Sequence, residues 1–122
     1  LLTLEDTEKR RRAINAKRTF ENLFSLGFVP IVNENDSIAT SEIKYGDNDR
    51  LSSRVAQISG ADCLILLSDV EGLYTKNPKI NKEAILIKEI STIDDKIEKI
   101  ATKSISEHGT GGMKTKIDAA KV

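Results

Sequence analysis

A short apolar run near the middle of the chain constrains the fold more than any other feature. Residues 63–67 (Cys, Leu, Ile, Leu, Leu) are bounded by polar residues on both sides, as expected for a β-strand buried on both faces. Residues 28–32 form an earlier apolar run, and residues 48–59 between the two runs have a helical pattern that ends at Gly60. A strand, a helix and a strand in this order predict a parallel pair.

Other segments extend the alternation of helices and strands. Residues 7–26 have the spacing of an amphipathic helix, and Gly27 suits the left-handed position that closes a helix. Residues 86–90 are a weaker strand candidate, and residues 113–122 begin a further helix. A helical face is also shared by Ile93, Ile97, Ile100 and Ala101. We therefore expect an α/β domain with helices on both sides of a mostly parallel sheet.

Composition narrows the class of protein. The 122 residues, 39% of them hydrophobic, can bury one modest core, which indicates a single domain or part of one. Basic and acidic residues both number 19, so the net charge is zero and we expect no nucleic acid partner. No apolar run approaches the roughly 20 residues of a membrane span, and no signal peptide is apparent. These features predict a soluble cytoplasmic protein without a membrane partner.

The cysteine content excludes two kinds of site. Cys63 is the only cysteine, so the chain has neither an internal disulfide nor a metal site built from several cysteines. Its apolar neighbours predict an inert thiol in a buried strand.

A glycine-rich loop at residues 109–112 leads into the last predicted helix. Backbone N–H groups at such a helix start favour phosphate. The segment does not match the P-loop, because Met113 stands where that pattern needs a glycine before its lysine. It does not match the dinucleotide pattern either, because Lys114 replaces the last glycine. The pattern alone leaves open both a phosphate loop and an ordinary surface loop.

Three more polar segments stand where ligands commonly bind. Residues 33–36 and the pair Ser68 and Asp69 follow predicted strands, and ligands of open α/β sheets bind beyond the carboxyl ends of strands. Residues 46–49 begin a predicted helix. Ordinary interpretations are a turn rich in Asn and Asp for residues 33–36 and helix capping for residues 46–49. Capping uses one polar side chain, which leaves others free to orient a lysine, a metal-bound water or a substrate amine.

Taken together, these segments resemble the glutamate 5-kinases, a branch of the amino acid kinase family. The match covers residues 32–36, 46–49, 67–69, 72–74 and 109–116, in order and in spacing. The resemblance implies a three-layer αβα sandwich with a mostly parallel sheet, of which residues 1–122 form a partial domain, incomplete at both ends. It also implies ATP-dependent phosphorylation of the side-chain carboxylate of L-glutamate, the first step of proline biosynthesis.

The resemblance also assigns residues to roles. Asn33, Asp36 and Asn48 would bind glutamate, with Asp36 facing its amino group. Lys116 would neutralise charge on the transferred phosphoryl group, and Asp49 would position that lysine. Such transfers depend mainly on alignment and on cations around the phosphoryl oxygens, and ATP would bring Mg²⁺, whose protein ligands stay unassigned. The nucleotide-binding residues would be Ser68, Asp69, Thr110, Gly111, Gly112, Met113, Lys114, Thr115 and Lys116.

The chain departs from the family pattern in a few places. Asn77 and Lys79 stand where many relatives have Asp and Arg, and Ser68 replaces the more usual threonine. The family's first strand, with its lysine and a substrate-binding serine, would precede Leu1, so we expect the 122 residues alone to be inactive. The resemblance further implies a homo-oligomer and feedback inhibition by proline, for which residues 33–44 are the place to look.

Two alternatives remain open from the sequence. One is another kinase of the same family, acting on aspartate, acetylglutamate or a nucleoside monophosphate. The other is a non-catalytic regulatory module that binds an amino acid and a nucleotide.

Overall fold

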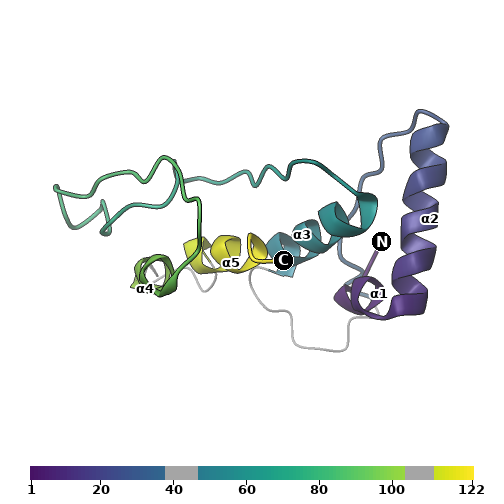
Figure 1. The fold of residues 1–122 in the computed structure, drawn as a ribbon, viewed down its shortest axis with the longest axis horizontal. Helices are drawn as coiled ribbons and strands as arrows, with labels where there is room; N and C mark the ends of the chain where they lie inside the picture. The colour runs from purple at the N-terminus through teal and green to yellow at the C-terminus, as the bar shows by residue number, and fades with distance from the viewer. Residues whose placement is uncertain (38–46, 104–111) are drawn as a thin grey trace.

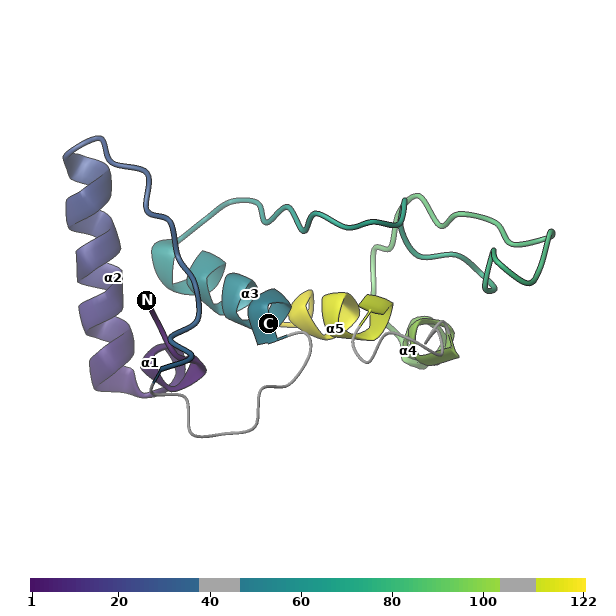
Figure 2. The ribbon, with the colours of Figure 1, turned by 180° about the vertical axis from the view of Figure 1, so that it is seen from behind.

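The computed structural model describes residues 1–37, 47–103 and 112–122. The helices in these ranges are α1 (Leu4–Glu8), α2 (Arg10–Ser25), α3 (Asp47–Ser59), α4 (Asp95–Lys103) and α5 (Gly112–Ala119). Helices α1, α2 and α3 pack together at one end of the molecule, and α4 packs on α5 at the other (Figure 1). Helix α5 also contacts α3, so it joins the two ends (Figure 2).

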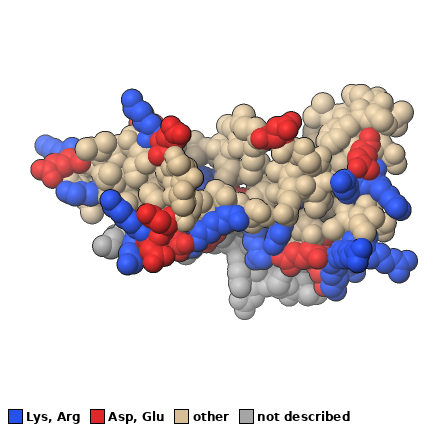
Figure 3. Space-filling model, viewed as in Figure 1, with Lys and Arg blue, Asp and Glu red and all other residues tan. Residues whose placement is uncertain are grey.

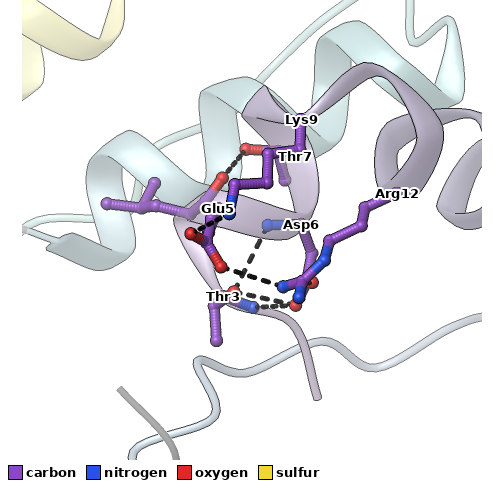
Figure 4. Close-up of polar contacts among 7 residues, drawn as sticks. Thr3, Glu5, Asp6, Thr7, Lys9 and Arg12 are labelled. Atoms are coloured by element: carbon purple, nitrogen blue, oxygen red, sulfur yellow. Dashed lines mark hydrogen bonds and ion pairs between the residues drawn. The ribbon is translucent and has the colours of Figure 1, made fainter. Parts of the chain in front are cut away.

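The first helical segment differs from the prediction. A single helix over residues 7–26 was expected, but the structure has two helices that break at Lys9, whose φ of −75° and ψ of 116° are extended. Helix α1 begins earlier because Thr3 and Asp6 form a capping box: the Asp6 amide donates to the Thr3 hydroxyl at 3.3 Å, and the Thr3 amide donates to Asp6 at 2.9 Å (Figure 4). This reciprocal cap satisfies amides that a helix start leaves unpaired.

Charged side chains fasten the start of α2 to α1. Arg12 contacts Glu5 at 2.9 Å and Asp6 at 3.0 Å, and Lys9 contacts Glu5 (Figure 4). The hydrogen bond from the Thr3 backbone amide, supported by Arg12, lowers the pKa of Asp6. The contact with Lys9 likewise lowers the pKa of Glu5. Both carboxylates therefore favour their ionised forms, in which they hold the two helices together.

Glycines end α2 and α3 as predicted. Gly27 and Gly60 have φ values of 76° and 71°, in the left-handed region. The amide after each glycine donates to the carbonyl five residues back, at 2.9 Å in both cases, which is the Schellman arrangement. After each glycine the chain turns sharply into an extended segment.

Strand pairing in the described ranges is limited to isolated bridges. Leu2 pairs in parallel with Glu34: the Leu2 amide donates to the Asn33 carbonyl at 3.0 Å and the Asn35 amide donates to the Leu2 carbonyl at 2.9 Å. These two hydrogen bonds hold Leu2 beside the segment that follows α2. Tyr74 and Leu86 form an antiparallel bridge near the weaker strand candidate.

The predicted buried strands do not appear as strands in the part of the chain that the structure describes. Residues 28–32 and 63–67 are extended but form no ladder there, and most of their side chains are open to solvent, with Ile31 96% and Leu67 89% exposed. The prediction that Cys63 is buried was wrong, because its thiol is exposed. A ladder needs a second strand alongside, hydrogen-bonded to the first, and in the described residues these two segments do not pair with each other.

A small core lies at the α4–α5 end. Leu73, Ala101 and Ile117 are buried together, at 5%, 0% and 7% exposure. The residues packed around them come mainly from residues 87–100 and include Ile93, Ile97 and Ile100, as the predicted helical face requires. The helix over residues 95–103 therefore forms as its pattern predicts, and it holds α5 in place.

The surface carries charges of both signs. Figure 3 shows Lys and Arg gathered over the α1–α2 end, with Asp and Glu interspersed. Among the helices described here, none combines the length and apolar character required to cross a bilayer.

Candidate functional site

An ion pair between α3 and α5 brings together the two residues predicted to be catalytic. The Lys116 ammonium lies 3.0 Å from Asp49 Oδ1 and 3.2 Å from Oδ2. The Thr115 hydroxyl also reaches Asp49 Oδ2, at 2.8 Å. The side chains of Lys116 and Asp49 are only 21% and 19% exposed, so water screens their charges less than it screens a surface pair.

Neighbouring contacts fix both ends of this pair. At the start of α3, Arg50 donates to Glu8 of α1 at 2.8 Å, and Leu51 is 3% exposed. On α5, Ile117 is buried directly after Lys116. The helix positions thus hold the Asp49 carboxylate and the Lys116 ammonium against each other over a sequence distance of 67 residues.

A cavity of about 560 Å³ opens beside the same turn of α3. Asn48, which precedes Asp49, lines it together with Asn33 from the extended segment that follows α2. Two of the three residues predicted to bind glutamate therefore share one hollow. The remaining lining residues are Pro30, Val32, Leu51, Ser52, Val55, Ala56, Ser59, Ala61, Cys63 and Leu64.

Apart from Asn48, the cavity residues of α3 were not foreseen, although a signal for them exists. Asn48, Ser52, Val55 and Ser59 lie three or four positions apart, and residues at this spacing share one face of a helix. Ser52 and Ser59 add hydroxyl groups to a lining that is otherwise largely apolar. Counting from Asn48 in steps of three and four residues along the helix identifies Ser52, Val55 and Ser59.

The other predicted site residues lie apart from this cluster or outside the described ranges. Asp36 is exposed, just beyond the parallel bridge, and it does not line the cavity. Ser68 and Asp69 are exposed on the extended segment after α3, where the Ser68 hydroxyl accepts from the Val70 amide at 3.4 Å. Thr110 and Gly111 lie outside the described residues.

The described part of the glycine-rich segment forms the start of α5, as predicted. Gly112 is the first residue of the helix and has a φ of 33°. Met113 packs against the small core, and Lys114 pairs with Asp118 on the helix surface. In the nearby segment 72–74, the Tyr74 hydroxyl donates to Glu71 at 2.5 Å, and this carboxylate raises the pKa of Tyr74.

This arrangement places a lysine–carboxylate pair beside two side-chain amides. The Asp49 carboxylate balances the charge of the Lys116 ammonium and holds it in a fixed position, and the ammonium has three hydrogens to donate. The amides of Asn33 and Asn48 nearby can both donate and accept hydrogen bonds. Such groups suit a ligand with phosphate at one end and polar, ionised groups at the other.

Comparison with known proteins agrees with this picture. A family model described as the amino acid kinase family matches residues 1–121. The chain belongs to the amino acid kinase family. The fold of that family is therefore the fold to which these residues contribute, although its sheet is not formed within the described ranges.

Within the amino acid kinase family, the chain is most informatively compared with three proteins named glutamate 5-kinase. It is 86% identical over all 122 residues to the one from Pelagibacter ubique, of which it covers 33%. It is 57% identical to the one from Rhizobium etli and 53% to the one from Agrobacterium fabrum, covering 31% of each. The resemblance seen in the sequence is thereby confirmed, and the chain spans about a third of the length of these relatives.

Proposed function

We propose that this chain contributes the glutamate site and the phosphate-facing lysine of a glutamate 5-kinase, which transfers the terminal phosphoryl group of ATP to the side-chain carboxylate of L-glutamate. The observation that carries the proposal is the Asp49–Lys116 pair between α3 and α5, beside a cavity lined by Asn33 and Asn48. The 86% identity to a protein named glutamate 5-kinase supports this choice among the family's activities. The product, glutamyl 5-phosphate, would enter proline biosynthesis.

In this mechanism Lys116 acts on the phosphoryl group. The glutamate carboxylate is already ionised at neutral pH and needs no base, so catalysis consists of alignment and of stabilising the charge that spreads over the phosphoryl oxygens. The Lys116 ammonium supplies one such charge. Asp49 holds it at 3.0 Å before the substrate arrives, so little reorganisation is needed during the reaction.

The cavity residues would orient the amino acid. We assign Asn33 and Asn48 to glutamate because both line the same hollow, and Asp36 to its amino group on the basis of the sequence resemblance. Ser68, Asp69 and residues 110–116 would bind the nucleotide.

Magnesium fits this site as an ion carried by ATP. Among the residues whose positions are described, no three carboxylate, histidine or cysteine side chains form a metal-binding group, and Asp49 is already occupied by Lys116. Mg²⁺ commonly relies on substrate phosphates and water for most of its ligands. When bound, it would supply further positive charge at the phosphates.

The extended apolar segments fit a domain larger than this chain. We propose that residues 28–32 and 63–67 become parallel strands of the αβα sandwich when the rest of the kinase provides their neighbours, which would cover side chains such as Ile31 and Leu67. We further propose a cytoplasmic homo-oligomer that proline inhibits. Residues 1–122 would then be part of one kinase domain.

The test is an acceptor panel on the full-length protein. ADP release should require L-glutamate and should stay at background with aspartate, acetylglutamate or a nucleoside monophosphate. Proline, added to the glutamate reaction, should lower the rate. Release with another acceptor alone would reassign the substrate within the family. Binding of ATP and glutamate without any turnover would instead favour a regulatory module.

A further inference from the structure

Thr115 occupies a position that the nucleotide-binding assignment does not explain. Its hydroxyl oxygen lies 2.8 Å from Asp49 Oδ2 and 2.9 Å from the carbonyl of Gly112. Both neighbours are acceptors, whereas a threonine hydroxyl has a single hydrogen to donate. The hydroxyl therefore donates either to Asp49 or to Gly112, and it has no second hydrogen for another acceptor.

This limit bears on phosphate binding. A phosphate oxygen of ATP is an acceptor, so the Thr115 side chain can bind it only by giving up the hydrogen bond that it now donates. Giving up the bond to Asp49 would also release one side of the carboxylate that holds Lys116. A side chain that contacts phosphate would be expected to aim its donor outward, yet the two acceptors recorded for the Thr115 hydroxyl are protein groups, on α3 and at the start of α5.

The bond to Asp49 completes a three-part cluster. Lys116 spans both carboxylate oxygens, at 3.0 and 3.2 Å, and Thr115 binds Oδ2 from the preceding residue of the same helix. Two neighbouring residues of α5 thus hold one carboxylate of α3. Since rotation of the Asp49 carboxylate would break the Thr115 bond, the hydroxyl restricts the direction in which the carboxylate presents itself to Lys116.

We propose that Thr115 is a positioning residue, which orients Asp49 and through it the Lys116 ammonium, and that it is not a ligand of the nucleotide. This inference rests on the proposed kinase function, and it removes Thr115 from the residues assigned above to the nucleotide. It gives the segment 110–116 two separate tasks: its glycine-rich part meets the phosphates, and Thr115 joins α5 to α3.

The kinetic test uses two variants of the full-length protein. Thr115→Val removes the hydroxyl but nearly keeps the shape, and Thr115→Ser keeps the hydroxyl. A positioning role predicts that Thr115→Val lowers kcat about 5- to 30-fold, the effect of one hydrogen bond of about 1–2 kcal/mol. The KM for ATP should change less than about twofold, and Thr115→Ser should restore most of the turnover.

A nucleotide ligand would behave differently. If Thr115 bound the phosphates in the ground state, Thr115→Val would raise the KM for ATP and leave kcat nearly unchanged. That pattern, or full turnover in Thr115→Val, would overturn the inference.

A double-mutant cycle separates this inference from the proposed function. In an Asp49→Ala background, Thr115→Val should have almost no further effect on kcat, because the bond is already absent. The same four proteins should show coupled shifts in thermal unfolding midpoint, which needs no turnover. Independent shifts would refute the positioning role. Lack of glutamate-dependent ADP release by the unmutated protein would refute the kinase proposal while leaving the unfolding cycle to decide the role of Thr115.

Discussion

Replacing Lys116 is the most informative single change in the proposed site. Lys116→Ala removes the ammonium that lies 3.0 Å from Asp49, and with it one fixed positive charge for the transferred phosphoryl group. Loss of one preorganised donor typically costs about 3 kcal/mol in the transition state, or roughly 100-fold in rate. We expect kcat to fall by about this factor, with a smaller effect on ATP affinity.

Lys116→Ala should also lower the free energy of unfolding, by an amount that depends on how deeply the Asp49–Lys116 pair is buried. Exposed ion pairs contribute about 0–1 kcal/mol, and loss of one partner from a fully buried pair costs about 3–5 kcal/mol. With Lys116 and Asp49 each about one-fifth exposed, an intermediate loss of about 1–2 kcal/mol in the free energy of unfolding is expected. The full-length variant should therefore fold, and its slow turnover can be attributed to the missing charge.

The assay is glutamate-dependent ADP release at saturating ATP, with ATP affinity measured separately by titration. Lys121→Ala is a matched control, because Lys121 is also an ion-paired lysine close to α5 and its partner, Glu98, lies on α4 away from Asp49. The control should keep normal turnover. Normal turnover in folded Lys116→Ala, or an equal loss in both variants, would refute the assigned role of Lys116.

Four further changes test other parts of the structure. Asn48→Ala should raise the KM for glutamate about tenfold, because roughly one hydrogen bond to a charged group is lost, and it should leave the KM for ATP unchanged. A comparable rise in KM for both substrates would indicate misfolding. Asp6→Asn should lower the free energy of unfolding by about 1 kcal/mol at pH 7. Folding lowers the pKa of Asp6, so the stabilisation by the ionised Asp6 carboxylate is present above the unfolded pKa of about 4 and is lost as the pH falls below it. In denaturant titrations, the difference in stability between Asp6→Asn and the unmutated protein should therefore disappear in acid. Leu73 is 5% exposed, and Leu73→Ala should lower the free energy of unfolding by about 2–5 kcal/mol in the same titration at pH 7. Ile80 is 85% exposed, and Ile80→Ala should change the free energy of unfolding by less than about 0.5 kcal/mol.

Helices were predictable from the sequence because their signals are local. The period of three and four residues located α3, α4 and α5 to within a few residues, and the glycines at 27 and 60 marked two helix ends. The break at Lys9 was missed because the apolar period of α2 gives no sign of it. Its signal lies upstream, in the Thr3–Asp6 capping box, whose hydrogen bonds start a separate helix.

Strands were less predictable because they depend on distant partners. An apolar run such as residues 63–67 reports a preference for burial, but a ladder forms only when another strand lies beside it. Leu2 and Glu34 have such a contact and form a bridge, whereas the neighbouring Ile31 stays 96% exposed. The exposure of Cys63 follows from the same lack of neighbours.

The candidate site was partly predictable through resemblance. Asp49 and Lys116 were expected to act together, and they are in contact in the structure. The bond from Thr115 to Asp49 crosses 66 residues, and no local pattern in the sequence indicates which of the residues 110–116 makes it. Only the packing of α5 on α3 identifies Thr115.

The most direct test of the account is a crystal structure of the full-length protein with L-glutamate and a non-hydrolysable ATP analogue. The account predicts glutamate within hydrogen-bond distance of Asn33 and Asn48, and a terminal phosphate oxygen about 2.7–3.2 Å from Lys116 Nζ. Asp49 should still contact Lys116 and Thr115. A nucleotide bound on another face of the molecule, or glutamate held away from the α3 cavity, would contradict it.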